Sequence, residues 1–163
     1  MDFIVAKATE LGVDRIIPLE AERSVRRATV ARSSRWLRIV QEAAEQCGRR
    51  DLPEVAPTSN LGAFLLGHPR EVPLLTCDAS QQSQPLMAAC RELEAASCLT
   101  LLIGGEGGLS PAEIERLRSY GARLTSLGPR ILRAETAALA ALAIIQAVVA
   151  DWGKTGPHFQ MEN

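Results

Sequence analysis

The stretch CLTLLIGGEGGLSPAE, residues 98–113, decides the fold class of this chain. It joins an apolar run, 98–103, to a glycine-rich segment, 104–108, and then to a strong helix start. Ser110 is predicted to cap that helix, Pro111 takes its first position, and Glu113 completes a capping box with Ser110. A buried strand that leads through a tight turn into a helix is typical of α/β proteins.

Strands and helices alternate along the rest of the 163 residues. Apolar periodicity and turn residues predict helices at 2–11, 33–48, 59–66, 85–95, 111–120 and 135–151, and strands at 15–19, 53–57, 72–77, 98–103 and 122–127. Asp2 and Ser59 are predicted to cap the first and the third of these helices. We therefore expect an α/β fold with a mainly parallel sheet flanked by helices. One domain is expected at residues 1–152, and 153–163 is predicted to be a flexible tail.

The composition excludes several classes of protein. Hydrophobic residues make up 47% of the chain and aromatic residues only 4%, which is too few for an aromatic base-stacking surface. The longest apolar segment, 137–150, is interrupted by Gln146 and is shorter than the roughly 18 residues of a membrane span, and no signal peptide opens the chain. The spacing of the four cysteines and two histidines fits no metal site, so we expect no metal and reduced thiols in a cytoplasmic protein.

A basic segment lies within a chain whose net charge is only −1. Residues 15–50 hold nine arginines and four glutamates. Because the arginine fork binds phosphate in a bidentate manner, this segment suggests a partner that carries phosphate. The alternative is that an arginine-biased composition simply covers solvated helix faces.

Two loops have the position and composition of a ligand site, because ligands in open α/β sheets bind beyond the carboxyl ends of the strands. The first is the glycine-rich segment 104–108. It lacks the Gly-Lys-Ser/Thr ending of a nucleotide-binding P-loop, and position 110 is Ser where a dinucleotide-binding pattern needs Gly. A tight turn without a ligand remains an alternative for this loop.

The second loop, LGPRILRAETA at 127–137, places two charged arginines around the apolar pair Ile131 and Leu132. We interpret the apolar pair and the loop backbone as the wrapping of a flat apolar ring. In the alternative, Ile131 and Leu132 anchor the loop in the core and Glu135 stabilises the start of the following helix.

Both loops resemble the signature of the ribosomal small-subunit methyltransferase E family. The resemblance extends over about residues 3–150 and includes IGGEGGLS at 103–110 with Glu113 and Ile114, the loop 127–137, KATELGV at 7–13, Glu22-Arg23-Ser24, and the segment from Trp36 to Arg49. Members of this SPOUT-superfamily family methylate N3 of a uridine in small-subunit ribosomal RNA. The chain departs from the family pattern at Gly105, where a proline is usual, and it begins near the second domain, after the usual PUA-like RNA-binding domain.

The resemblance implies a SPOUT-type fold with a C-terminal deep trefoil knot, S-adenosylmethionine as the cofactor, ribosomal RNA of the small subunit as the partner, and a homodimer. It implies a cofactor site formed by Cys77, Ile103, Gly104, Gly105, Glu106, Gly107, Leu127, Gly128, Ile131 and Leu132. The arginines expected to bind RNA phosphates are Arg23, Arg26, Arg27, Arg35, Arg38 and Arg49.

Three residues are the candidates for catalysis. Arg133 is expected to stabilise negative charge on the uridine carbonyl oxygens, and Glu135 is a candidate acceptor for the N3 proton. Arg130 is the second choice, together with Glu106. The apolar face of the last helix, Leu139, Leu142, Ile145 and Val149, belongs either to the core or to a dimer interface. Two other functions remain open, a SPOUT methyltransferase that acts on transfer RNA and a non-catalytic RNA-binding module.

Overall fold

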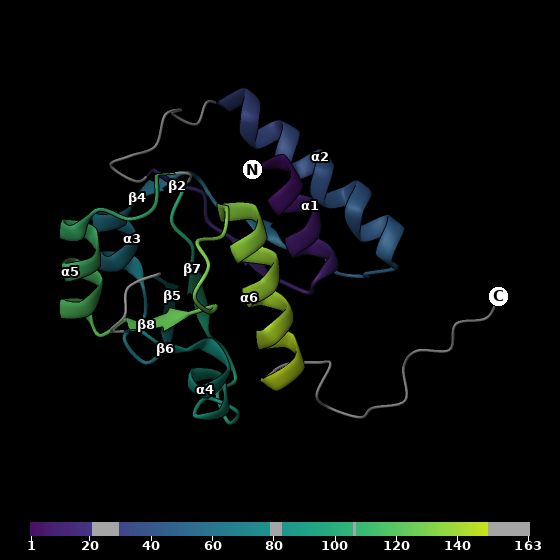
Figure 1. Ribbon diagram of the computed structural model, residues 1–163. Coiled ribbons are helices and arrows are strands. Elements are labelled where there is room, and N and C mark those ends of the chain that lie inside the picture. The colour runs from purple at the N-terminus through teal and green to yellow at the C-terminus, as the bar shows by residue number, and fades with distance from the viewer. Residues whose placement is uncertain (21–29, 79–82, 106, 150–163) are drawn as a thin grey trace.

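The main sheet of the computed structural model has four strands in the order β6-β8-β5-β7. The model describes residues 1–20, 30–78, 83–105 and 107–149 (Figure 1). The strands are β5 (Leu74–Cys77), β6 (Gln84–Pro85), β7 (Thr100–Leu102) and β8 (Arg123–Ser126). Every strand pair in the described residues is parallel, which confirms the predicted α/β fold with a mainly parallel sheet.

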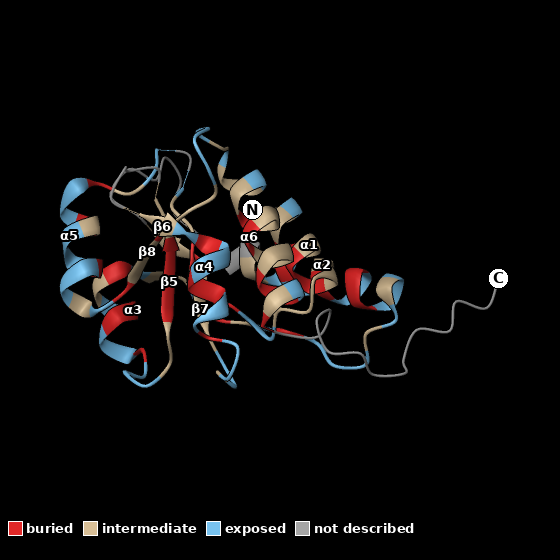
Figure 2. Ribbon diagram, turned by 60° about the horizontal axis from the view of Figure 1, so that its bottom comes forward, coloured by how far each residue is buried: buried red, intermediate tan, exposed pale blue. Residues whose placement is uncertain are grey.

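One face of this sheet is covered by α3 (Leu61–Gly67) and α5 (Pro111–Tyr120) (Figure 2). Leu74 and Leu102 of the sheet pack with Phe64 of α3 and Leu117 of α5 in one buried cluster. The predicted capping box at the start of α5 is confirmed: the Ser110 hydroxyl accepts from the Glu113 backbone N–H, and the Glu113 carboxylate accepts from the Ser110 N–H.

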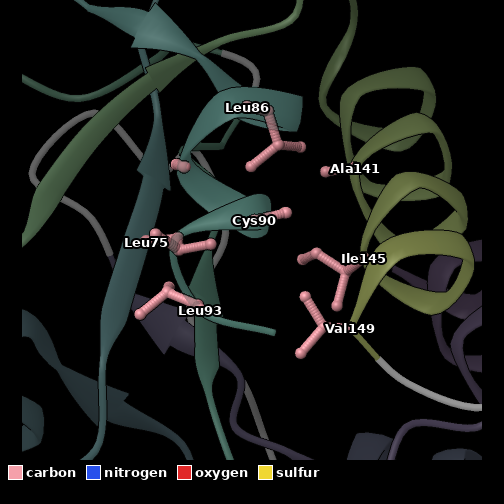
Figure 3. Close-up of a cluster of buried hydrophobic side chains, with 8 residues drawn as sticks. Leu75, Leu86, Cys90, Leu93, Ala141, Ile145 and Val149 are labelled. Carbon is pink, nitrogen blue, oxygen red and sulfur yellow. The ribbon is translucent and has the colours of Figure 1, made fainter. Parts of the chain in front are cut away.

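The opposite face is covered by α4 (Leu86–Arg91) and α6 (Ala134–Val148). Side chains alternate across a strand, so Leu75 points to this face while Leu74 points to the other. Figure 3 shows Leu75 beside Leu86 and Cys90 of α4, facing Ile145 of α6. Leu142 packs against a third cluster, so Leu142, Ile145 and Val149 belong to the core of the chain.

That third cluster joins α6 to α1 (Asp2–Glu10) and α2 (Val30–Cys47), which lie side by side (Figure 1). Its centre is formed by Val5 and Trp36, and the indole Nε1 of Trp36 donates to Asp2 Oδ1 at 3.0 Å. Gln146 of α6 also donates to the Leu11 carbonyl oxygen. The N-terminal helices are therefore fixed to the helix that follows the second candidate loop.

Two short parallel pairs complete the fold. β1 (Arg15–Ile16) pairs with β3 (Glu54–Val55), and β2 (Leu19–Glu20) pairs with β4 (Ser59–Asn60). The predicted strand at 15–19 is thus interrupted near Pro18, which lacks the N–H that a ladder needs. No helix among the described residues is both long and apolar enough to cross a membrane.

Several predicted boundaries were wrong. Asp2 lies inside α1 and does not cap it, because its carboxylate is taken by Trp36 and by Arg35, which lies 2.6 Å away. Asn60 rather than Ser59 caps α3 by accepting from the Ala63 N–H. Helix α2 begins at Val30, before the predicted start, and α4 ends earlier than predicted, at Arg91. The predicted tail, 153–163, and the last residues of the predicted final helix lie outside the described residues.

Candidate functional site

A cleft of about 600 Å³ lies where the chain leaves β5, β7 and β8. Its size falls within the usual range of small-ligand sites, about 300–1,000 Å³. β5 pairs with both β7 and β8 in parallel register, so the three carboxyl ends meet at one edge of the sheet. The residues around the cleft are Cys77, Asp78, Ile103, Gly104, Gly105, Gly108, Leu109, Ser126, Leu127, Gly128, Arg130, Ile131, Leu132, Arg133, Ala134, Glu135 and Ala137.

The glycine-rich loop folds back tightly on itself at this edge. The Gly108 N–H donates to the Gly105 carbonyl oxygen at 2.9 Å. A Cβ added at Gly104 would lie 3.1 Å from both the Gly108 carbonyl carbon and the Leu109 nitrogen. The close approach of backbone to backbone therefore favours glycine at position 104, since a Cβ there would make its neighbours shift by a few tenths of an ångström. Among the predicted residues of this loop, Glu106 lies outside the described residues and Gly107 is exposed but does not line the cleft.

The second loop begins with a turn at Gly128, whose φ of 108° favours glycine. The Gly128 N–H donates to the Ser126 hydroxyl at 3.1 Å. Leu127 packs against the cluster between β5 and α6, and Leu132 is half-buried, but Ile131 is 90% exposed. The alternative that both Ile131 and Leu132 anchor the loop in the core is therefore wrong for Ile131.

The three predicted catalytic residues all line the cleft. Arg130 and Arg133 are exposed, whereas Glu135 is half-buried in the first turn of α6. The positive end of the helix dipole favours a carboxylate in that first turn. Guanidinium groups and a carboxylate thus stand at one opening, where they can neutralise charge and accept a proton on a bound molecule.

Cys77 ends β5 at the floor of the cleft. Its Sγ lies 3.8 Å from the Thr125 Oγ1. Burial raises the pKa of the Cys77 thiol above its ordinary value. The thiol is therefore protonated at neutral pH and offers a small, weakly polar surface rather than a nucleophile.

The predicted RNA-binding arginines do not form one group in the described structure. Arg35 and Arg38 are exposed on α2, and Arg35 pairs with Asp2 at 2.6 Å. Three more of the predicted arginines lie outside the described residues: Arg23, Arg26 and Arg27.

Arg49 has a different environment from the one we expected. Its side chain is only 12% exposed, and its guanidinium binds the carboxylates of Asp14 and Asp51 at 2.9 and 2.8 Å. It also donates to the carbonyl oxygens of Thr9 and Val13. Arg49 therefore joins the end of α1 to the end of α2, and we leave it out of the proposed RNA surface.

Most of the chain matches a known protein family. A family model described as an RNA methyltransferase domain matches residues 1–146. The chain belongs to the RNA methyltransferase domain family.

Named relatives of this RNA methyltransferase domain agree with the resemblance that the sequence suggested. The chain is 36% identical over 156 residues to ribosomal RNA small subunit methyltransferase E of Bacillus subtilis. The aligned region covers 89% of this chain and 60% of that protein. It is 38% identical over 148 residues to the protein of the same name from Synechocystis, and that aligned region covers 90% of this chain and 48% of that protein. The chain thus spans about half to three fifths of these relatives.

Solved structures resemble the RNA methyltransferase domain closely. Ribosomal RNA small subunit methyltransferase E from Neisseria gonorrhoeae, crystallised with S-adenosyl methionine, is 35% identical and superposes with a TM-score of 0.80, over 90% of this chain and 60% of that one. A putative methyltransferase from Legionella pneumophila, in complex with the same cofactor, is 33% identical with a TM-score of 0.75, over 90% of this chain and 60% of that one.

Our sequence reasoning missed several residues around the cleft of this RNA methyltransferase domain. Asp78 is the chemically most informative of them, because it places a carboxylate at the end of β5, where the Ser83 hydroxyl lies 3.5 Å from it. Its position directly after Cys77 was the available signal. Leu109 and Ser126 also line the cleft, and each flanks a segment that was predicted.

Proposed function

We propose that this chain transfers a methyl group from S-adenosylmethionine to N3 of a uridine in small-subunit ribosomal RNA. The observation that carries the proposal is the shared cleft, in which both signature loops and the end of β5 surround one volume. The names of the relatives and the cofactor in the crystallised neighbours support the same function.

The residues around the cleft fit the cofactor. Ile103, Leu109, Leu127 and Leu132 supply apolar surface for an adenine ring. The glycine loop lets backbone groups approach closely, since a Cβ at Gly104 would lie only 3.1 Å from the backbone of Gly108 and Leu109. When bound, S-adenosylmethionine supplies an electrophilic methyl group. The protein therefore has to hold the two reactants in line and handle one proton.

Arg133 and Glu135 are proposed to handle the charge and the proton. Uridine N3 would form a bond to the methyl carbon as the bond from that carbon to the sulfonium sulfur breaks and its electron pair stays on sulfur. The N3 proton would pass to the Glu135 carboxylate. The neighbouring carbonyl oxygens, on which negative charge develops, accept hydrogen bonds from the Arg133 guanidinium. Arg130, on the same rim, is the second candidate for this role.

A C-terminal deep trefoil knot, a homodimer and a cytoplasmic location belong to the same proposal. The family resemblance supports the knot, the dimer and the location. Residues 127–133 meet the segments that follow β5 and β7 around one cleft before the chain enters α6. Light scattering tests the dimer, since the expected mass in solution is twice that of one chain.

Mass spectrometry of nucleosides tests the reaction. Small-subunit ribosomal RNA that lacks the modification and, in a parallel reaction, unmodified transfer RNA are incubated with the chain and S-adenosylmethionine, then digested and analysed. The expected product is N3-methyluridine. A methylated ribose in transfer RNA instead would favour the transfer RNA alternative, and RNA binding without any methylated product would favour a non-catalytic RNA-binding module.

A further inference from the structure

Ile131 stands out from the rest of the cleft because its side chain is 90% exposed. Its neighbour Leu132 is half-buried, although both belong to the same apolar pair. Single exposed aliphatic residues are common on protein surfaces and need no explanation by themselves. Leu66 of α3, at 91% exposure, is such a residue and lies outside the cleft. Ile131 differs from Leu66 because it occupies the rim of the cleft.

The charges beside Ile131 indicate what it would meet there. Arg130 and Arg133 flank it along the loop, and both are exposed on the same rim. An exposed aliphatic side chain in a loop that also exposes two arginines matches a nucleotide, which presents an apolar base face next to a charged phosphate. Ile131 also lines the cleft, but its 90% exposed side chain leaves most of its surface open to a second molecule at the rim.

The reaction adds a geometric requirement. N3 of uridine lies on the edge that pairs with other bases, so pairing blocks access to N3. A base that is held in a stack also cannot enter a cleft in the protein. Enzymes that act on such an atom take the base out of the stack, and aliphatic side chains, isoleucine among them, separate bases by entering between them. With aromatic residues at only 4% of the chain, an aliphatic side chain is a reasonable replacement for an aromatic one.

We infer that Ile131 is a wedge that enters the base stack of the RNA next to the target uridine and keeps that uridine turned into the cleft. This inference rests on the proposed function, and it moves Ile131 from the predicted cofactor set to the substrate. Arg130 would hold a phosphate beside the wedge, and Arg133 would hold the target uridine. Ile131 is thus a positioning residue, whereas Arg133 and Glu135 touch the reacting atoms.

Chemical rescue tests the wedge. The RNA is a fragment of small-subunit ribosomal RNA that carries the target uridine without its methyl group, in an intact form and in a form with abasic nucleotides on both sides of that uridine. Abasic neighbours remove the stack that a wedge has to open. The proteins are the unmodified chain, Ile131→Ala, the conservative Ile131→Leu and the matched control Leu66→Ala, and each is assayed for methyl transfer and for S-adenosylmethionine binding.

Ile131→Ala is expected to lower kcat/KM on intact RNA about tenfold or more, because extracting a base from its stack is costly. On the abasic RNA its activity should return to within a few fold of the unmodified chain. Ile131→Leu and Leu66→Ala should stay close to the unmodified chain on both RNAs, and the affinity for S-adenosylmethionine should be unchanged throughout.

Two results would overturn the wedge while the proposed function stands. One is an Ile131→Ala variant that methylates intact RNA as fast as the unmodified chain. The other is a loss that is equal on both RNAs or that is accompanied by weaker cofactor binding, which would return Ile131 to the cofactor site. An unmodified chain that methylates neither RNA would instead contradict the proposed function itself.

Discussion

Single residues around the cleft divide into an apolar wall and an exposed charged rim. Leu127 and Leu132 are partly buried, whereas Arg130 and Arg133 are exposed. The wall suits a flat ring, and the rim suits a phosphate-bearing substrate. The two groups should therefore respond differently to mutation, with cofactor affinity depending on the wall and the glycine loop, and turnover depending on the rim.

Arg133→Ala is expected to lower kcat about 100-fold or more, the usual effect of removing one donor that stabilises developing negative charge. Affinity for S-adenosylmethionine should change only a few fold, because the exposed Arg133 side chain is not part of the apolar wall. Single-turnover methyl transfer and calorimetry measure the two effects. Arg91→Ala on α4, which lies outside the cleft, is the control. Equal losses of binding and turnover would contradict the assigned role.

Gly104→Ala tests the tight loop. The new methyl group would meet Gly108 and Leu109 backbone atoms at 3.1 Å, so the loop must open. Overpacking of this kind typically costs about 1–3 kcal/mol, which predicts a loss of cofactor affinity of about tenfold. Gly67→Ala is the matched control, since nothing lies within 4 Å of its added Cβ. A Gly104→Ala variant that binds the cofactor normally would show that the loop shape does not matter.

Individual side chains were the least predictable part of the site. The sequence placed Arg49 in a basic segment, but the structure surrounds its guanidinium with Asp14, Asp51 and two carbonyl oxygens. Those partners come from the end of α1 and from the chain beyond α2, and their approach depends on helix packing. Asp78 was missed for a related reason, because only the strand order brings it to the loops after β7 and β8.

Elements were predicted best where several local signals coincide. Ser110, Pro111 and Glu113 together located the start of α5 correctly. Ser59 and Asn60 are both good helix caps, and the sequence alone did not show which one begins α3. Strand lengths were overestimated, since a strand extends only as far as its neighbour pairs with it. β6 was not predicted because it is a two-residue strand that exists through its pairing with β8.

A polar cluster joins three elements at the edge of the sheet away from the cleft. Tyr120 of α5 donates its hydroxyl proton to the His68 carbonyl oxygen, so the His68 Nδ1–H donates to the Tyr120 oxygen at 2.9 Å. The His68 Nε2 then accepts from the Thr100 hydroxyl of β7, also at 2.9 Å. With this assignment of the protons His68 is neutral, and both of its ring nitrogens form hydrogen bonds. Arg70 stacks over the Tyr120 ring at 3.9 Å.

This cluster predicts a pH dependence of stability. Burial lowers the pKa of His68 below its ordinary value, and Arg70 lowers it further, while Glu71 opposes the shift. The unfolded chain then binds the proton more readily, so the free energy of unfolding should fall as the pH drops below about 6.5 and should not depend on His68 above that value. Urea denaturation from pH 7.5 to pH 5 measures the slope, and His68→Gln should reduce it. Identical slopes for both proteins would contradict the assignment.

The fold of the whole molecule brings together two loops that are separated in the sequence. Both loops were predicted from composition, but their convergence on one cleft depends on the order β8-β5-β7, which local patterns do not determine. Parallel pairing of β5 with both neighbours places all three carboxyl ends at one edge. α6 follows directly from the second loop and packs against both α4 and α1 (Figure 2). The helix packing on that side of the sheet therefore holds the second loop in place.

Isothermal titration of the folded chain with S-adenosylmethionine tests the central claim most directly, because it asks whether the cleft between the two loops holds the cofactor at all. The expected result is saturable binding at one site per chain that Gly104→Ala weakens and Gly67→Ala leaves unchanged. A chain that is folded by circular dichroism but shows no binding, or binding that is insensitive to Gly104→Ala, would contradict it.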